Sequence, residues 1–190
     1  MNQQLWFQNY YRVRKKVLAI GNKYWIEDKA GNIIGFSKQK ILKLKEDIRI
    51  YSDEKMTEEV FRIKQQQILD VVGNFAVIDS KTEQVLGFLK RKALKSSFLW
   101  DEWEIYDPNK QLIGQIKESA GLGILRKFLT FIPEKMTVTI HGQPVATVTQ
   151  RFKVIGDIWE LNITNMPQNV DRRVILGALI LMAMIERQHK

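Results

Sequence analysis

The sequence contains no cysteine among its 190 residues. This absence excludes a disulfide framework, a thiol nucleophile and any metal site built on cysteine ligands. Its two histidines, His141 and His189, do not make a zinc ligand set. No strand–turn–helix serine motif and no phosphate-loop lysine is present either. We therefore expect no catalytic residues, no metal, no cofactor and no enzymatic activity.

Long apolar segments are also scarce. The longest uninterrupted run has twelve residues, Val174–Ile185. A helix that crosses a bilayer needs about 20 apolar residues, so this run is too short to span one. The N-terminus lacks the basic start and the apolar stretch of a secretory signal. We therefore expect a cytoplasmic protein that is not an integral membrane protein, and whose membrane contact, if any, is peripheral.

Acidic residues are fewer than basic ones, since 21 aspartates and glutamates stand against 30 lysines and arginines, for a net charge of +9. Such a charge favours an anionic partner, which is a phospholipid surface, a nucleic acid or an acidic protein. A soluble basic protein with no such partner is an equally good interpretation, because the basic residues are spread over the whole chain.

A repeated unit runs through the first two thirds of the chain. Four acidic turns contain Asp28, Asp53, Asp79 and Asp107, at spacings of 25, 26 and 28 residues. An apolar strand follows each turn and runs into basic or polar residues, as in Val85-Leu86-Gly87-Phe88-Leu89-Lys90. A repeat near this period indicates one supersecondary unit that is used several times, here a β-hairpin and its connection.

The repeat predicts a barrel. A further hairpin turns at Gly142, and an opening strand near 11–18 and a last strand near 157–164 bring the expected number of strands to about twelve. Consecutive hairpins form an antiparallel meander, which leaves the fewest open edges when it closes on itself. We expect a mainly β protein, with a single closed antiparallel barrel domain over residues 1–190.

The apolar run at the C-terminus predicts a helix, from about Asp171 to Arg187, that is apolar on every side. Such a helix must be buried all round, and because it is too short to span a membrane we expect it inside the barrel. A twelve-stranded barrel is wide enough to need it, since side chains alone fill a barrel of about eight strands. A short extra helix is predicted at Ser119–Pro133, either on one end of the barrel or in a membrane interface.

Several motifs carry a resemblance to a known family. They are the repeat ends Ile26-Glu27-Asp28, Ile78-Asp79 and Ile105-Tyr106-Asp107, the segment Phe152-Lys153-Val154-Ile155-Gly156-Asp157, and the segment Asp171-Arg172-Arg173-Val174-Ile175-Leu176. With a twelve-stranded barrel around a hydrophobic helix, they resemble the tubby C-terminal-like superfamily, and most of all its LURP-one-related proteins. The phospholipid scramblases are more distant relatives. The resemblance extends from about Tyr10 to Ile185.

The resemblance implies a barrel and little chemistry. Tubby domains bind phosphoinositide headgroups through basic residues, scramblases are linked to calcium and lipid movement, and the LURP-one-related family implies no defined activity. The chain departs from the scramblase pattern because it has no cysteine to palmitoylate. Its acidic residues Asp101, Glu102, Glu104 and Asp107 are scattered along a strand and form no calcium loop. We interpret them as solvent-facing strand and turn residues.

Basic residues suggest an anion-binding site. Lys38 and Lys40 share one face of a strand, as do Lys90 and Lys92, and the two pairs occupy equivalent positions in the repeat. We hypothesise a basic band that binds anionic lipid headgroups, to which each lysine or arginine contributes about 1 kcal/mol. The candidate residues are Arg12, Arg14, Lys15, Lys16, Lys38, Lys40, Lys90, Arg91, Lys92, Arg126 and Lys127.

Other interpretations of these charges stay open. The same residues serve as solubilising charges if the protein is a protein-binding scaffold or a regulatory domain with no lipid ligand, and the sequence predicts no particular protein partner. Aromatic residues beside Arg12 and Arg14 suggest a nucleic-acid site. However, Trp25, Trp103 and Trp159 fall at repeat-equivalent strand positions, where core packing explains them. Nucleic acid is therefore disfavoured.

Overall fold

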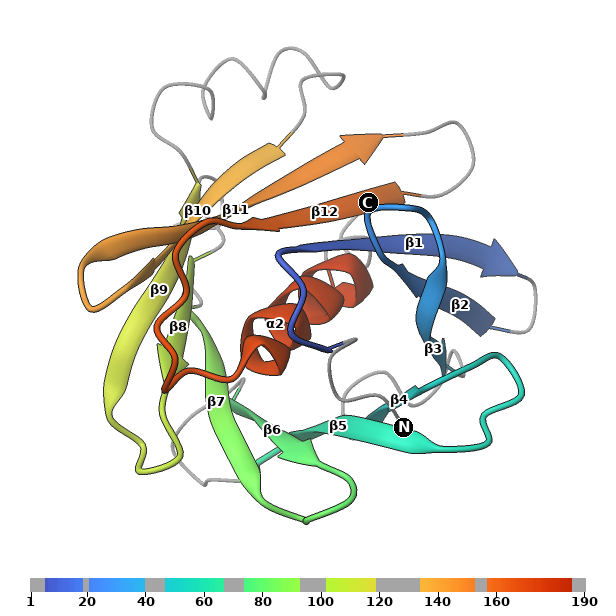
Figure 1. Cartoon of the computed structure of the whole chain (residues 1–190), viewed down its shortest axis with the longest axis horizontal. Helices are drawn as coiled ribbons and strands as arrows, with labels where there is room; N and C mark the ends of the chain where they lie inside the picture. The colour runs from blue at the N-terminus through green and yellow to red at the C-terminus, as the bar shows by residue number, and fades with distance from the viewer. Residues whose placement is uncertain are drawn as a thin grey trace.

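The computed structural model describes residues 6–18, 21–39, 47–66, 74–92, 102–118, 134–152 and 157–185. These residues form one closed antiparallel barrel in which each strand pairs with its neighbours in the sequence and β1 closes against β12 (Figure 1). The strands are β1 (Tyr10–Leu18), β2 (Gly21–Glu27), β3 (Ile33–Gln39), β4 (Asp47–Tyr51), β5 (Glu59–Gln65), β6 (Asn74–Asp79), β7 (Val85–Lys92), β8 (Glu102–Tyr106), β9 (Leu112–Glu118), β10 (Glu134–Ile140), β11 (Gln143–Phe152) and β12 (Asp157–Ile163). The predicted twelve-stranded meander and its closure are confirmed.

The C-terminal helix α2 (Arg172–Ile185) lies inside the barrel, as predicted (Figure 1). Every residue from Val174 to Met184 is buried. A small residue at Gly177 lets the helix approach the wall, because a Cβ atom there would lie only 3.1 Å from Val77 of β6. The second predicted helix, Ser119–Pro133, lies outside the described residues.

The strands alternate between the core and the surface, as an antiparallel sheet with one buried face requires. In β4, Ile48 and Ile50 are buried, whereas Asp47 and Arg49 are exposed. The same alternation places the large side chains of Trp103 and Trp159 in the core. Core packing therefore explains these two tryptophans, as predicted.

Three of the four acidic turns of the repeat share one geometry. Asp28, Asp53 and Asp107 each accept, through a carboxylate oxygen, a hydrogen bond from the backbone N–H four residues further on. Their carbonyl oxygens accept a second bond from the N–H three residues on. That third residue has a positive φ in each turn, and it is Gly31, Met56 or Lys110. The aspartates therefore recur because this turn needs a side-chain acceptor at its start.

The remaining acidic turn, that of Asp79, also holds the helix. Asp79 Oδ1 accepts the backbone N–H groups of Lys81 and Thr82, while its Oδ2 accepts a hydrogen bond from Arg173 Nη1 at 2.5 Å. Arg173 also pairs with Asp171, directly before the helix, at 2.7 Å. We call Asp79, Asp171 and Arg173 the helix clasp. It ties the start of α2 to the turn between β6 and β7.

The helix clasp makes stability depend on pH. Burial raises the pKa of Asp79, but hydrogen bonds from the Thr82 N–H and from Arg173 outweigh it and hold the pKa below its ordinary value. A carboxyl with a lowered pKa stabilises the fold above its unfolded pKa of about 4, and this contribution is lost as the pH falls through the folded pKa. We expect the free energy of unfolding in urea to drop below about pH 4.

Asp79→Asn tests this pH dependence, because it removes the titrating group and keeps the size of the side chain. We expect the variant to be less stable than the wild type at neutral pH and to lose less stability on acidification. Urea titrations at several pH values between about 3 and 7 measure both quantities. Parallel stability curves for the two proteins would contradict the role of Asp79.

Candidate anionic-ligand site

Carboxylates pair with the predicted basic residues of β7. Lys90 and Lys92 lie on one face, as predicted, and their ammonium groups lie 3.8 and 3.1 Å from Glu104 of β8. Glu102 adds a second pair to Lys92, and the Tyr106 hydroxyl donates to Glu104 at 2.6 Å. Burial raises the pKa of Glu104, but hydrogen bonds from Tyr106 and Lys92 outweigh it and lower the pKa. Glu104 is therefore charged at neutral pH and competes with any external anion.

A second paired group covers β11, β12, β1 and β2. Arg12 lies 3.6 Å from a carboxylate oxygen of Glu27 and 3.4 Å from one of Glu160. Arg151 pairs with the other oxygen of Glu160 at 2.9 Å. Arg12, another residue of the predicted band, is therefore held between two carboxylates.

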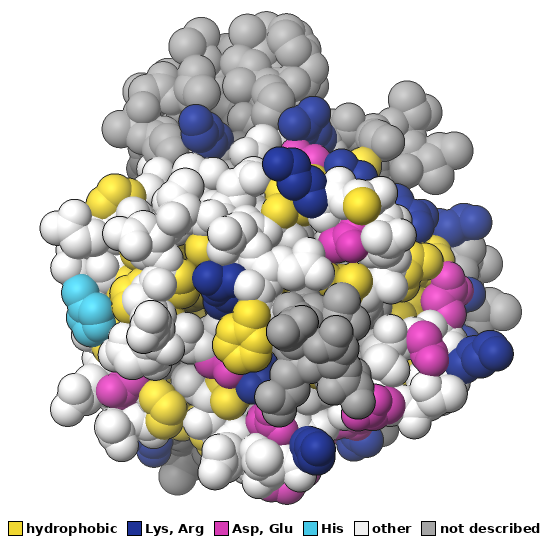
Figure 2. Space-filling model, in the orientation of Figure 1, with side chains coloured by type: hydrophobic (Ala, Val, Ile, Leu, Met, Phe, Trp, Pro, Cys, Tyr) yellow, Lys and Arg dark blue, Asp and Glu magenta, His cyan; other side chains and the backbone are white. Residues whose placement is uncertain are grey.

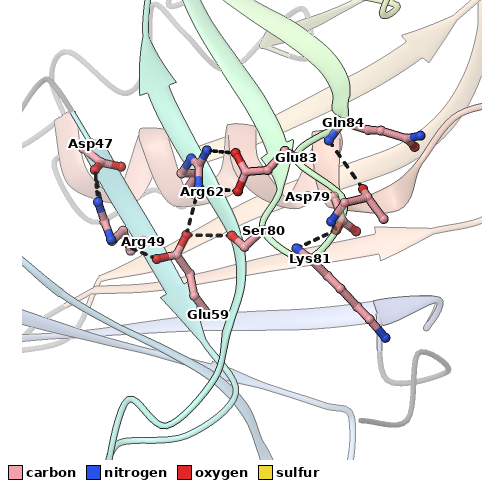
Figure 3. A network of polar contacts seen from close by, with 10 residues as sticks. Asp47, Arg49, Glu59, Arg62, Asp79, Ser80, Lys81, Glu83 and Gln84 are labelled. Carbon is pink, nitrogen blue, oxygen red and sulfur yellow. Dashed lines mark hydrogen bonds and ion pairs between the residues drawn. The ribbon is translucent and has the colours of Figure 1, made fainter.

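A third network joins β4, β5 and the turn after β6 (Figure 3). Arg49 pairs with Asp47 and with Glu59, while Arg62 pairs with Glu59 and with Glu83. Both arginines are thus neutralised by neighbouring acids. Figure 2 shows the same tendency on one face of the molecule, where basic and acidic side chains are interspersed.

Lys15 does not share the outer face of β1. It alternates with Arg14 and Lys16 along the strand and is only 6% exposed. Its Nζ atom lies 5.7 Å from the ring centre of Tyr24, which is fully buried. The expectation that Lys15 belongs to an outer band is corrected, because successive side chains of a strand point to opposite faces.

The same alternation separates Arg91 from its neighbours. Arg91 is the register partner of Trp103, a core residue, and lies between Lys90 and Lys92. It therefore lies on the opposite face of β7 from the two lysines, which corrects its assignment to the band. The remaining predicted residues Lys40, Arg126 and Lys127 lie outside the described residues.

Three lysines lie side by side on the outer face of β1, β2 and β3. Lys16 is the register partner of Lys23, and Lys23 is the register partner of Lys38. Adjacent strands lie about 4.8 Å apart, so the three positions span about 10 Å. Lys16 and Lys38 are exposed, and none of the three forms an ion pair within the described part of the chain. We call these three residues the lysine row.

The lysine row differs from the paired groups in its electrostatics. Like charges directly opposite one another on a sheet destabilise it. No carboxylate offsets this repulsion within the described strands, whereas Glu104 does so for Lys90 and Lys92. An anionic ligand would therefore relieve the repulsion in the lysine row without first having to displace a carboxylate.

A row of aromatic residues lies beside the lysine row. Arg14, Trp25 and Phe36 are register partners across β1, β2 and β3. The Arg14 guanidinium carbon lies 4.4 Å from the ring centre of Trp25, and the Lys23 ammonium lies 6.0 Å from that of Phe36. Trp25 is buried, as predicted, but it lies on the outer face of the sheet and outside the core cluster.

Two further findings limit the chemistry of the site. Among the residues that the structure describes, no group of three or more histidine, aspartate or glutamate side chains could hold a metal ion. Within the same residues, no helix combines the length and the apolar character that crossing a bilayer requires.

The sequence patterns did not indicate Lys23 as a site residue, although it is the central residue of the lysine row. Its signal is the strand register, because Leu18 pairs with Gly21 and this pair places Lys16 opposite Lys23. Counting back along both strands from this pair identifies the contact. Charge clusters along the sequence do not reveal it, since the two lysines are separated by seven positions.

Comparison with known proteins places the barrel among related folds. A model of the LURP-one-related family matches residues 34–183. The X-ray structure of a protein from Arabidopsis thaliana is similar with a TM-score of 0.50 and 13% identity, over 92% of this chain and 89% of that chain. At this identity the similarity concerns the fold alone. No match was found among the curated proteins.

Proposed function

We propose, since the chain belongs to the LURP-one-related family, that it is a non-enzymatic binding domain that attaches peripherally to anionic phospholipid. The family indicates a tubby-like domain of undefined role and by itself identifies no ligand. The observation that carries the proposal is the lysine row, with three adjacent lysines and no ion-pair partner within the described residues.

A membrane surface suits the lysine row because it presents many negative charges over a broad area. Each lysine near an anionic membrane contributes about 1 kcal/mol, and salt screens this contribution. A single-stranded nucleic acid suits the row less well, because its bases stack on exposed aromatic faces. Trp25 and Phe36, the aromatic residues beside the row, are only 7% and 1% exposed.

The combined variant Lys16→Gln, Lys23→Gln and Lys38→Gln tests this proposal. We expect its affinity for vesicles of phosphatidylcholine with phosphatidylserine or phosphoinositide to fall roughly 100-fold, from about 1 kcal/mol per lysine. Co-sedimentation with these vesicles over a salt series measures the change. Wild-type binding should be absent on vesicles of phosphatidylcholine alone and should weaken as salt is added.

A matched control removes the same charge elsewhere. Lys29, Lys55 and Lys81 are exposed in the turns after β2, β4 and β6. Changing these three to Gln should reduce vesicle binding far less than changing the lysine row. Equal losses in both variants would mean that net charge alone attracts the protein. If the wild type bound no anionic vesicle at low salt, the lipid proposal would fail and the alternative of a protein-binding scaffold would take its place.

A further inference from the structure

Arg14 is held in a fixed orientation at the edge of the lysine row. Its Nε donates to Glu27 Oε1 at 2.9 Å, and its guanidinium carbon lies 4.4 Å from the ring centre of Trp25. Glu27 is itself held, because Arg12 pairs with its other oxygen. A guanidinium fixed by both an ion pair and an aromatic ring loses little further freedom when it binds a ligand.

The fixed guanidinium still offers donors. The side chain of Arg14 is 40% exposed, and within the described residues its terminal amino groups donate no hydrogen bond. These amino groups form a planar fork that matches two oxygens of a phosphate or carboxylate. By contrast, Arg12 contacts both Glu27 and Glu160.

Two lysines lie next to this fork. Lys16 follows Arg14 by two residues on β1, so both side chains share the outer face about 7 Å apart along the strand. Lys23 is the cross-strand partner of Lys16. The flexible lysine side chains can therefore reach an anion that the Arg14 fork holds. One fork and two ammonium groups around one point suit a compact ligand with more than one negative charge.

We infer that Arg14, Lys16 and Lys23 form a clamp for a phosphate monoester. A monoester carries about −1.5 to −2 charges at neutral pH and three acceptor oxygens, whereas a phosphodiester carries about one charge and two free oxygens. The monoester therefore offers the fork and the two lysines one more acceptor oxygen and up to about one more negative charge than the diester does. The inference rests on the proposed function and adds selectivity among anionic ligands to it. The monoester is either the terminal group of a lipid or a free organic phosphate.

Vesicles that differ in headgroup test the clamp. Phosphatidic acid presents a monoester and phosphatidylglycerol a diester, and each is mixed with phosphatidylcholine to the same measured surface potential. We expect the wild-type chain to bind the phosphatidic acid vesicles roughly 10-fold more tightly, the scale of an added charge-assisted hydrogen bond. Arg14→Lys keeps the charge and removes the fork, so it should bind both vesicles alike.

Arg151→Lys is the matched control, because Arg151 is an exposed arginine on the outer face that pairs with Glu160. It should keep the preference for phosphatidic acid, and thermal melts should show that both variants are folded. Equal wild-type binding to the two vesicles would overturn the clamp and leave the proposed function standing. The clamp would also be overturned if the Arg14→Lys variant kept the preference for phosphatidic acid vesicles. If neither anionic vesicle is bound, the proposed function fails as well.

Calorimetric titration with glycerol 3-phosphate separates the two sources of the monoester. Saturable binding that Arg14→Lys abolishes supports a clamp for free organic phosphates. Binding to phosphatidic acid vesicles without measurable binding of glycerol 3-phosphate supports a clamp for a lipid headgroup, in which the membrane supplies the remaining affinity. Binding of glycerol 3-phosphate that Arg14→Lys leaves unchanged would contradict the clamp.

Discussion

Leu179→Asp is expected to abolish cooperative folding. Leu179 lies in the middle of α2, and its side chain is fully buried in the hydrophobic core of the barrel. Burying a carboxylate without a partner costs several kcal/mol or more, a large share of the roughly 5–15 kcal/mol by which a domain is stable. Urea unfolding followed by far-ultraviolet circular dichroism should show no sigmoidal transition for this variant.

Leu112→Asp is the control for this experiment. The chemical change is the same, but Leu112 begins β9 and its side chain is 59% exposed. Surface substitutions of this kind usually change stability by about 0.5 kcal/mol or less. If Leu179→Asp stayed soluble and unfolded as cooperatively as Leu112→Asp, the central helix would not be buried as described.

Arg173→Met is expected to lower the free energy of unfolding by about 3 kcal/mol at neutral pH. The substitution leaves the mostly buried carboxylates of Asp79 and Asp171 without their shared cation. The destabilisation should shrink below about pH 4, because Asp79, whose pKa is lowered in the fold, no longer needs a cation once it is protonated. Urea titrations at about pH 7 and about pH 3.5 measure both effects.

The adjacent Arg172 provides the control for the helix clasp. Its guanidinium donates to the carbonyl oxygen of Phe7 in an exposed position. Arg172→Met should therefore cost less than about 1 kcal/mol and should show little dependence on pH. Equal destabilisation by the two substitutions would show that the clasp contributes no more than a surface arginine.

The barrel and its central helix follow from local patterns. The acidic turns recur because each one needs an aspartate acceptor, and the strands between them alternate with a period of two. The run Val174–Ile185 is apolar on all sides and too short for a bilayer, so burial within the protein was the remaining environment. Turn chemistry and periodicity are properties of neighbouring residues, and therefore the sequence was sufficient to predict these elements.

The pairing of the basic residues could not be derived in the same way. Lys90 and Lys92 were predicted to share a face, and they do, but the neighbouring strand supplies Glu102 and Glu104 opposite them. Residues 93–101 separate the two strands in the sequence, and a separation of this length does not fix the register of a strand pair. A cluster of lysines in the sequence was therefore a poor guide to the charge that remains unpaired on the surface.

The lysine row depends on a single irregularity in the sheet. Counting from the pair Glu27–Ile33 without a bulge would place Lys23 opposite Ser37, and Lys38 would then lie on the other face. The register shifts by one residue between Ile26 and Glu27, and this bulge brings Lys38 beside Lys23. Periodicity along one strand can be derived from its residues, whereas hydrogen bonds between two strands set their register. For this reason the fold was evident in the sequence, and the candidate site became evident when the strands were paired in three dimensions.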